Sequence, residues 1–155
     1  MLKVLIADDE EKICQLIIKL INWEEMGLKI AATASNGIEA LEQAEICKPE
    51  IVITDIRMPG IDGMELIRKV KEKLPDTEII IISGYRHFEY AQTAIRYGVR
   101  NYLLKPIKKE ELRDTLQKIA DINREKNEQL NFEERVRLAL KNDAGKSVSY
   151  THLRA

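Results

Sequence analysis

Charged side chains stand directly behind three of the chain's short apolar runs. Asp8 and Asp9 follow the first run, Asp55 follows Ile51–Thr54, and Lys105 follows the last run. If these runs are parallel strands, their carboxyl ends meet at one edge of the sheet, where open α/β folds place ligands. Carboxylates gathered there repel one another unless a cation intervenes. Oxygen ligands suit Mg²⁺, so the spacing predicts a magnesium site with a lysine facing it.

A hydroxyl adds to this predicted site. Ser83 follows another apolar run, Ile79–Ile82. A lysine and a hydroxyl facing a metal ion suit an anion, and a phosphoryl group fits best. Asp55 would then act as the nucleophile and form an acyl phosphate, while Lys105 balances charge on the transferred oxygens. A simpler interpretation makes the aspartates helix caps, Ser83 a turn residue and Lys105 a solvated lysine. The coincidence of all of them at strand ends favours the site.

The elements that must position these residues alternate regularly. Five apolar strand patterns are each followed by a helical pattern within about 120 residues, which predicts an α/β fold with a doubly wound, five-stranded parallel sheet. Leu28–Ala34 is the weakest predicted strand because it is rich in alanine. The other four strands are predicted at Val4–Ala7, Ile51–Thr54, Ile79–Ile82 and Asn101–Leu104.

The pattern changes towards the C-terminus. Residues 1–122 hold the five alternations, and residues 123–144 are highly charged, which predicts a helical extension or linker. Lys126 and Glu133 interrupt its heptads, so a coiled coil is poorly supported. Residues 145–155 show no periodicity and are predicted to be an unstructured tail that need not be native.

Composition narrows the setting. A net charge of −1 gives no general attraction to nucleic acid or anionic membranes. No apolar run approaches the roughly 20 residues of a membrane span, and the N-terminus turns acidic too soon for a signal peptide. Cys14 and Cys47 lack metal-ligand spacing. These features predict a cytoplasmic protein without a membrane partner.

Together the motifs resemble the receiver domain of two-component response regulators, over about residues 1 to 120. The matching residues are Asp8-Asp9, Asp55 with Met58-Pro59-Gly60, Asp62-Gly63, Ser83-Gly84, Tyr102 and Lys105-Pro106. The resemblance implies a flavodoxin-like (βα)5 fold. It also implies that Asp55 accepts a phosphoryl group from a sensor histidine kinase, and that the domain catalyses only its own phosphorylation and dephosphorylation.

The same resemblance assigns roles to single residues. Asp9, Asp55 and the backbone carbonyl of Arg57 are expected to hold Mg²⁺, with Asp8 supporting the metal through water. Lys105 and Ser83 are expected to assist the phosphoryl transfer.

Ser83 and Tyr102 are the expected switch pair, and the Lys105–Pro106 peptide bond is expected to be cis. A homodimer through the surface of the fourth helix, fifth strand and fifth helix is also compatible with the resemblance.

Two stretches are similar to regulators with an AraC-type helix-turn-helix output domain. They are Asn22-Trp23-Glu24 with Gly27-Leu28, and Ser83-Gly84-Tyr85 with Phe88-Glu89-Tyr90-Ala91. The charged residues that follow are too few for such a domain, so we expect no direct DNA binding by this chain. The full-length parent is expected to control transcription.

Other functions remain open at this point. A phosphatase of the haloacid dehalogenase type normally needs a second aspartate two residues after the nucleophile, where this chain has Arg57. A flavin-binding domain of the same topology should have a first loop rich in Ser, Thr and Gly, whereas residues 8–11 are all acidic. A protein-interaction module of this fold that is never phosphorylated is a third alternative.

Overall fold

The computed structural model describes residues 1–84 and 88–142. The chain divides into two units, Met1–Ala120 and a second unit that begins at Asp121. The predicted tail at 145–155, and Tyr85 in the AraC-like stretch, lie outside the described residues. The predicted domain boundary at residue 122 stays a prediction.

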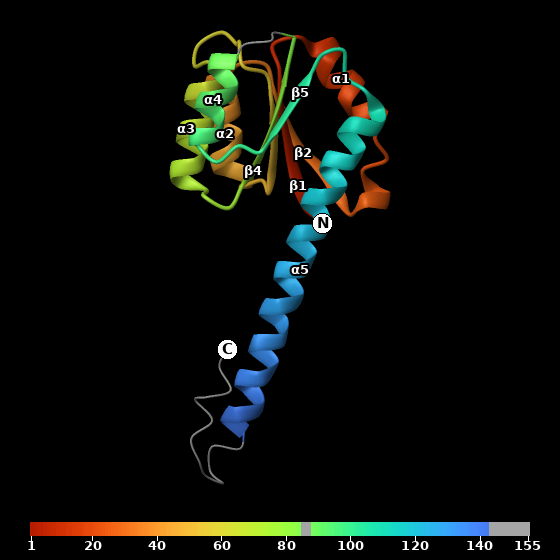
Figure 1. The fold of residues 1–155 in the computed structure, drawn as a ribbon, viewed down its shortest axis with the longest axis vertical. Coiled ribbons are helices and arrows are strands. Elements are labelled where there is room, and N and C mark those ends of the chain that lie inside the picture. Colours follow the sequence, from red (N-terminus) through yellow and green to blue (C-terminus); the bar gives the residue numbers. More distant parts are fainter. Residues whose placement is uncertain (85–87, 143–155) are drawn as a thin grey trace. The chain divides into compact units, whose positions relative to one another are not determined.

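A five-stranded parallel sheet forms the centre of the first unit (Figure 1). Its strands are β1 (Leu2–Ala7), β2 (Leu28–Ala34), β3 (Ile51–Thr54), β4 (Glu78–Ser83) and β5 (Asn101–Leu104), in the order β2-β1-β3-β4-β5. The doubly wound fold and all five predicted strands, including the alanine-rich β2, are confirmed. In the register, Ala7 pairs with Thr54. The residues that follow these two therefore leave the sheet side by side.

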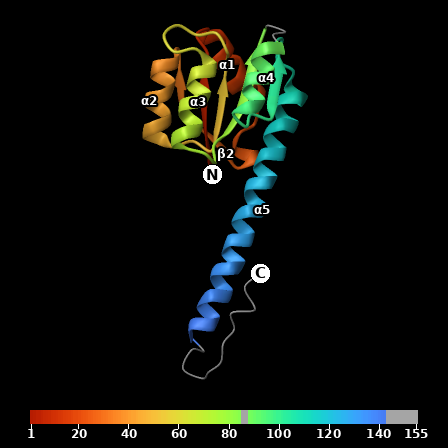
Figure 2. The same cartoon turned by 60° about the vertical axis from the view of Figure 1, so that its left-hand side comes forward.

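Helices cover both faces of the sheet. Figure 2 shows α2 (Gly37–Cys47), α3 (Gly63–Lys73) and α4 (Phe88–Arg96) side by side on one face. The other face is covered by α1 (Glu11–Leu20) and by the first turns of α5 (Lys109–Asn142). A short 3-10 helix, η1 (Glu24–Met26), precedes β2.

Alternate strand residues feed two separate hydrophobic cores, because successive side chains of a strand point to opposite faces. In β1, Val4 and Ile6 lie in the core under α1 and α5, while Leu5 lies in the core under α2 and α3. Both cores are rich in isoleucine and leucine with little or no exposed surface. Burial on both faces explains why the strands appear in the sequence as unbroken apolar runs.

Side-chain caps begin two of the helices that start at the carboxyl edge of the sheet. Asn36 accepts a hydrogen bond from the Glu39 N–H at 2.8 Å and begins α2. Asp62 accepts one from the Glu65 N–H at 2.9 Å and begins α3. Each cap satisfies a backbone donor that the first helical turn leaves without a partner. These caps fix the point at which each loop of this edge enters its helix.

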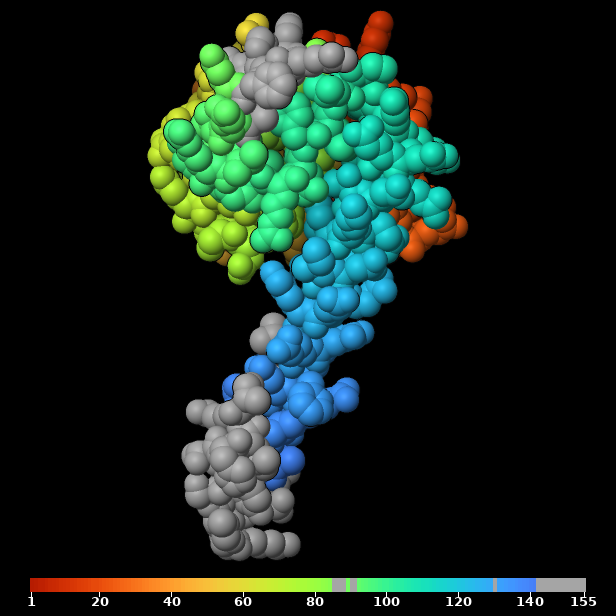
Figure 3. All heavy atoms as spheres, in the orientation of Figure 1, coloured from red at the N-terminus to blue at the C-terminus, as the bar shows by residue number. Residues whose placement is uncertain are grey.

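The outer surfaces of α4, β5 and the first turns of α5 form one continuous face, shown in green and teal in Figure 3. Ile95 of α4 and Leu104 of β5 expose 69% and 41% of their surface. Helix α5 continues without a break to Asn142, and the second unit exposes Ile122, Phe132 and Leu138.

No helix in the described residues is long and apolar enough to cross a membrane.

Gly63 provides a test of how the fold holds the end of β3. Its N–H donates to the Ile56 carbonyl at 2.6 Å, and a Cβ atom on it would lie 2.1 Å from the Asp55 carbonyl oxygen. We predict that Gly63→Ala lowers the free energy of unfolding by about 1–3 kcal/mol, the usual cost of overpacking. Urea unfolding measures this loss.

The matched control is Gly84→Ala, whose Cβ would have only Lys105 Cδ near it, at 3.9 Å. A loss of stability in Gly63→Ala no greater than in this control would contradict the close approach of α3 to the strand end.

Candidate functional site

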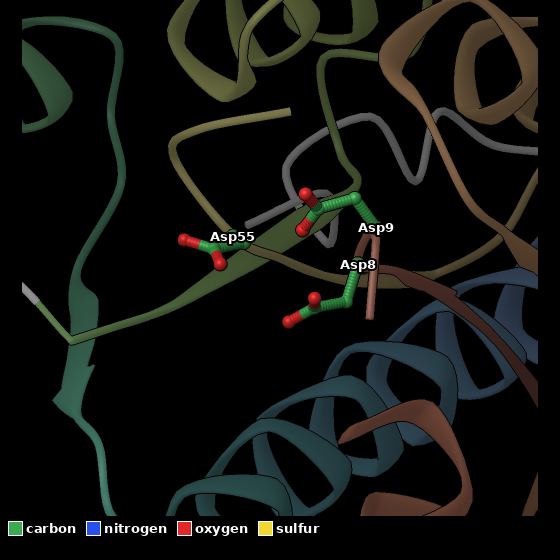
Figure 4. Close-up of side chains that lie close together, drawn as sticks. All are labelled: Asp8, Asp9 and Asp55. Carbon is green, nitrogen blue, oxygen red and sulfur yellow. The ribbon is translucent and has the colours of Figure 1, made fainter. Parts of the chain in front are cut away.

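Three carboxylates converge at the carboxyl edge of the sheet (Figure 4). Asp8 and Asp9 follow β1 and Asp55 follows β3, and one oxygen of each lies within 4.8 Å of the others. Asp8 and Asp55 are buried, at 3% and 9% exposed, while Asp9 is exposed. The sequence prediction that these side chains lie together is therefore correct.

The backbone holds the two buried carboxylates firmly in place. The Asp8 N–H donates to the Ala34 carbonyl at 3.0 Å, and the Asp55 N–H donates to the Ala7 carbonyl at 3.1 Å. Each side chain also accepts a nearby backbone N–H. Oδ1 of Asp8 accepts from Glu10 at 2.9 Å, and Oδ1 of Asp55 accepts from Ile56 at 2.6 Å. The second oxygen of each, Oδ2, faces Lys105.

Lys105 supplies the positive charge among them. Its Nζ lies 2.9 Å from Oδ2 of Asp55 and 3.2 Å from Oδ2 of Asp8. The lysine side chain is 19% exposed, so water screens these ion pairs only in part. The Lys105–Pro106 peptide bond is cis, as expected. The structure thus brings the predicted lysine to the predicted carboxylates.

Burial and charge act in opposite directions on the pKa values of Asp8 and Lys105. Burial raises the pKa of Asp8, although the Glu10 N–H and the charge of Lys105 oppose the rise. For Lys105, burial acts to lower the pKa, but hydrogen bonding to Asp55 and the charges of Asp55 and Asp8 outweigh it and raise the pKa. As far as the lysine's own charge is concerned, the stabilisation that Lys105 provides is present at neutral pH and is lost as the pH rises through that raised value.

Ser83, at the end of β4, and Tyr102, on the neighbouring strand β5, lie together. Ser83 ends β4 with no exposed surface, and its carbonyl accepts the Lys105 N–H at 2.8 Å. Burial raises the pKa of the half-buried Tyr102, a hydrogen bond with the Ser83 side chain lowers it, and the charge of Asp55 raises it. The predicted switch pair is therefore in contact, although Tyr102 is not part of the carboxylate cluster.

Arg57 lies at the mouth of the site. It is exposed and, with Asp9 and Asp62, lines a shallow hollow of about 350 Å³. Asp62 itself caps α3 and belongs to the loop before it. Sequence reasoning missed the closeness with which Gly63 packs on Asp55. The signal available was a glycine at the first position of a helix, where a side chain would normally be tolerated.

The donor set fits Mg²⁺. Its side-chain ligands are oxygens only, and Asp8, Asp9 and Asp55 are close enough to share one ion. Among the described residues this cluster contains only the three aspartates, and neither Cys14 nor Cys47 belongs to it. A soft metal would prefer sulfur or imidazole ligands.

Comparison with known proteins identifies the family. Residues 4–117 match the family described as the response regulator receiver domain. The chain belongs to this family. Its fold is that of the receiver domain of AraT, a response regulator of Geobacillus stearothermophilus, at 40% identity and a TM-score of 0.78, over 81% of this chain and 98% of that one. This receiver domain is thus a signalling module rather than a member of a classical enzyme family.

Its relatives include longer regulators. The chain is 44% identical over 126 residues to the transcriptional regulatory protein YesN of Bacillus subtilis. The matched part is 81% of this chain and 34% of that protein. It is 41% identical over 107 residues to the transcriptional regulatory protein HptR of Staphylococcus aureus, which covers 69% of this chain and 42% of that protein. The receiver therefore spans well under half the length of these curated relatives.

The contact of Lys105 with both buried aspartates gives a prediction for stability. Without the lysine, two buried carboxylates lose their counter-charge, and breaking such a pair costs about 3 kcal/mol. We expect Lys105→Met to lower the free energy of unfolding by that amount at pH 7.5 in EDTA. The deficit should shrink at pH 5.5, because Asp8, whose pKa is already raised, then takes up a proton more readily. Urea unfolding at both pH values measures it.

Lys73→Met is the matched control, since Lys73 pairs with Glu45 on the surface. Exposed ion pairs contribute little. Equal losses in the two variants would show that Lys105 does not neutralise the cluster.

Proposed function

We propose that this receiver accepts a phosphoryl group on Asp55 from a partner histidine kinase, in a reaction that requires Mg²⁺. The observation that carries the proposal is the position of the Asp55 carboxylate. It lies at the end of the central strand, within 4.8 Å of Asp8 and Asp9 and 2.9 Å from the Lys105 ammonium. A buried carboxylate with both a divalent-ion donor set and a lysine beside it is suited to phosphoryl chemistry rather than to capping alone.

Each residue has a defined part in the proposed transfer. An oxygen of Asp55 attacks phosphorus, and the bond from phosphorus to the donor nitrogen breaks, leaving its electron pair on the donor. Asp8, Asp9, Asp55 and the carbonyl of Arg57 would hold the ion, which screens the negative charges that approach one another. Lys105 exchanges its contact with Asp55 for one with the phosphoryl oxygens. The acyl phosphate is later hydrolysed in the same site, so the domain catalyses only its own phosphorylation and dephosphorylation.

We also propose that the receiver is part of a longer transcription factor with an AraC-type output domain. A solved two-component transcriptional regulator AraC of Clostridium phytofermentans is 35% identical, with a TM-score of 0.73 over 78% of this chain and 94% of that one. The length of YesN beyond the matched part leaves room for such a domain in a parent of that kind. A reading frame that continues past residue 155 into a different type of domain would contradict this.

The proposed partner surface is the face of α4, β5 and the first turns of α5 (Figure 3). Its Ile95 and Leu104 are large apolar side chains that the described residues leave exposed. A second receiver could pack on them and form a homodimer.

The free thiols Cys14 and Cys47 support the cytoplasm as the compartment, since disulfides are rare there.

The phosphoacceptor is tested directly by mass. We expect acetyl phosphate with Mg²⁺ to add one phosphoryl group to the chain, and Asp55→Asn to abolish the addition, because an amide is not a nucleophile for phosphorus. Intact-mass spectrometry measures the adduct. Asp62→Asn is the control, since asparagine also caps helices and Asp62 lies outside the carboxylate cluster. Labelling of the Asp55 variant to the level of this control would refute the assignment.

The contact between Ser83 and Tyr102 predicts how phosphorylation reaches the partner surface. A phosphoryl group on Asp55 offers strong acceptors, and a Ser83 hydroxyl that turns to it changes its contact with Tyr102 on β5. A ligand shifts an equilibrium only by its differential affinity for the two states. Ser83→Ala should therefore leave labelling of Asp55 largely intact and uncouple it from β5.

Hydrogen exchange of α4 and β5, with and without the phosphoryl mimic beryllofluoride, measures the coupling. We expect the parent chain to respond and Ser83→Ala to respond weakly or not at all. A full response in Ser83→Ala would exclude the pair as the switch.

A further inference from the structure

The loop that joins Asp55 to α3 is pressed against the first turn of α2. This turn begins at Asn36, and its first helical residue is Gly37, which is buried. The Gly37 N–H donates to the Pro59 carbonyl at 3.4 Å. A Cβ atom on Gly37 would lie 1.8 Å from the Ile61 carbonyl oxygen and 2.7 Å from the Ile61 carbonyl carbon. No side chain fits between the two backbones.

A glycine here is a cost to the helix. Glycine is one of the poorest helix formers, and an alanine would favour α2. Gly37 also does not need the left-handed conformation that usually calls for glycine, since its φ is not in that region. The close approach of Ile61 is therefore the physical reason that this position excludes a side chain.

Side-chain hydrogen bonds hold the first turn of α2. Ser35 bonds the Glu39 carboxylate through both its N–H and its hydroxyl, at 3.3 and 3.0 Å. Asn36 caps the same turn. The first turn of α2 is thus fixed by three side chains before it meets the loop.

The contacts with α2 fall on the middle of the loop. Its ends are held by β3 and by the bond from Gly63 to Ile56, at 2.6 Å. Between them, Met58 is buried in the core under α2 and α3, while Arg57, Pro59 and Gly60 are exposed. The contacts of Gly37 with Pro59 and Ile61 fall on this middle part.

We propose that Gly37 is a positioning residue for the metal site: by admitting the loop against α2, it sets the place of the Arg57 carbonyl. This inference rests on the proposed function, which assigns that carbonyl to Mg²⁺. A side chain at position 37 must displace the Ile61 carbonyl by more than an ångström, because Cβ contacts under 3.0 Å essentially do not occur. Metal sites lose affinity when the groups that orient their ligands move.

Calorimetric titration with Mg²⁺ tests the proposal on the full chain. We expect Gly37→Ala to weaken Mg²⁺ binding about ten-fold, in the range found when supporting residues of metal sites are changed. Ala44→Gly is the control for stability alone. It loosens the same helix at a buried residue near the other end, away from the loop, and should leave the affinity unchanged. Asp9→Asn reports on the metal site itself and should also bind weakly.

The outcomes are distinct. Weak binding in both Gly37→Ala and Asp9→Asn, with normal binding in Ala44→Gly, supports the positioning role. Normal affinity in Gly37→Ala beside weak binding in Asp9→Asn overturns the role of Gly37 and leaves the proposed function standing. Equal weakening in Gly37→Ala and Ala44→Gly overturns it as well, because the effect is then one of stability. Undiminished binding in Asp9→Asn refutes the proposed metal site, and the inference with it.

A folding defect in Gly37→Ala does not remove the test. Asn36→Ala keeps the glycine and deletes only the cap that fixes the turn. If Gly37→Ala is unfolded, weaker Mg²⁺ binding in Asn36→Ala than in Ala44→Gly supports the proposal, and equal affinity in these two variants overturns it.

Discussion

Repulsion among three carboxylates is the constraint on which this domain is built. Parallel strand ends bring Asp8, Asp9 and Asp55 within 4.8 Å of one another, and two of the three are buried. Like charges at that separation, away from water, destabilise the fold. Lys105 offsets the cost by bonding to both buried aspartates. The carboxyl edge of the sheet therefore carries an excess of negative charge. Lys105 neutralises part of it, and a divalent ion can neutralise more.

Backbone contacts hold the groups around these carboxylates. A carboxylate that could swing into water would relieve the repulsion and leave no site. Backbone N–H groups hold one oxygen of Asp8 and one of Asp55, and Gly63 packs directly on the Asp55 carbonyl. The neighbouring strand adds Ser83, whose carbonyl fixes the backbone of Lys105. These contacts restrict the movement of the groups around Asp55.

Much of this could be predicted from the sequence. Burial on both faces makes each strand an unbroken apolar run, and charged residues mark the strand ends. The sheet and the cluster at Asp55 could therefore be predicted from the sequence. The sequence could not decide whether α5 continues past Ile122 or is followed by a linker, because the charged residues 123–142 have only a loose apolar period. The contacts of Gly37 and Gly63 with distant backbone were also hidden, because a glycine carries no pattern that names the segment lying against it.

A crystal structure of the chain with Mg²⁺ and beryllofluoride tests the central claim most directly. The account predicts the mimic on a carboxylate oxygen of Asp55 and the ion among Asp9, Asp55 and the Arg57 carbonyl. Lys105 should have moved from Asp55 to a fluoride. An Asp55 that still pairs with Lys105, with mimic and metal absent from the cluster or bound elsewhere, would contradict it.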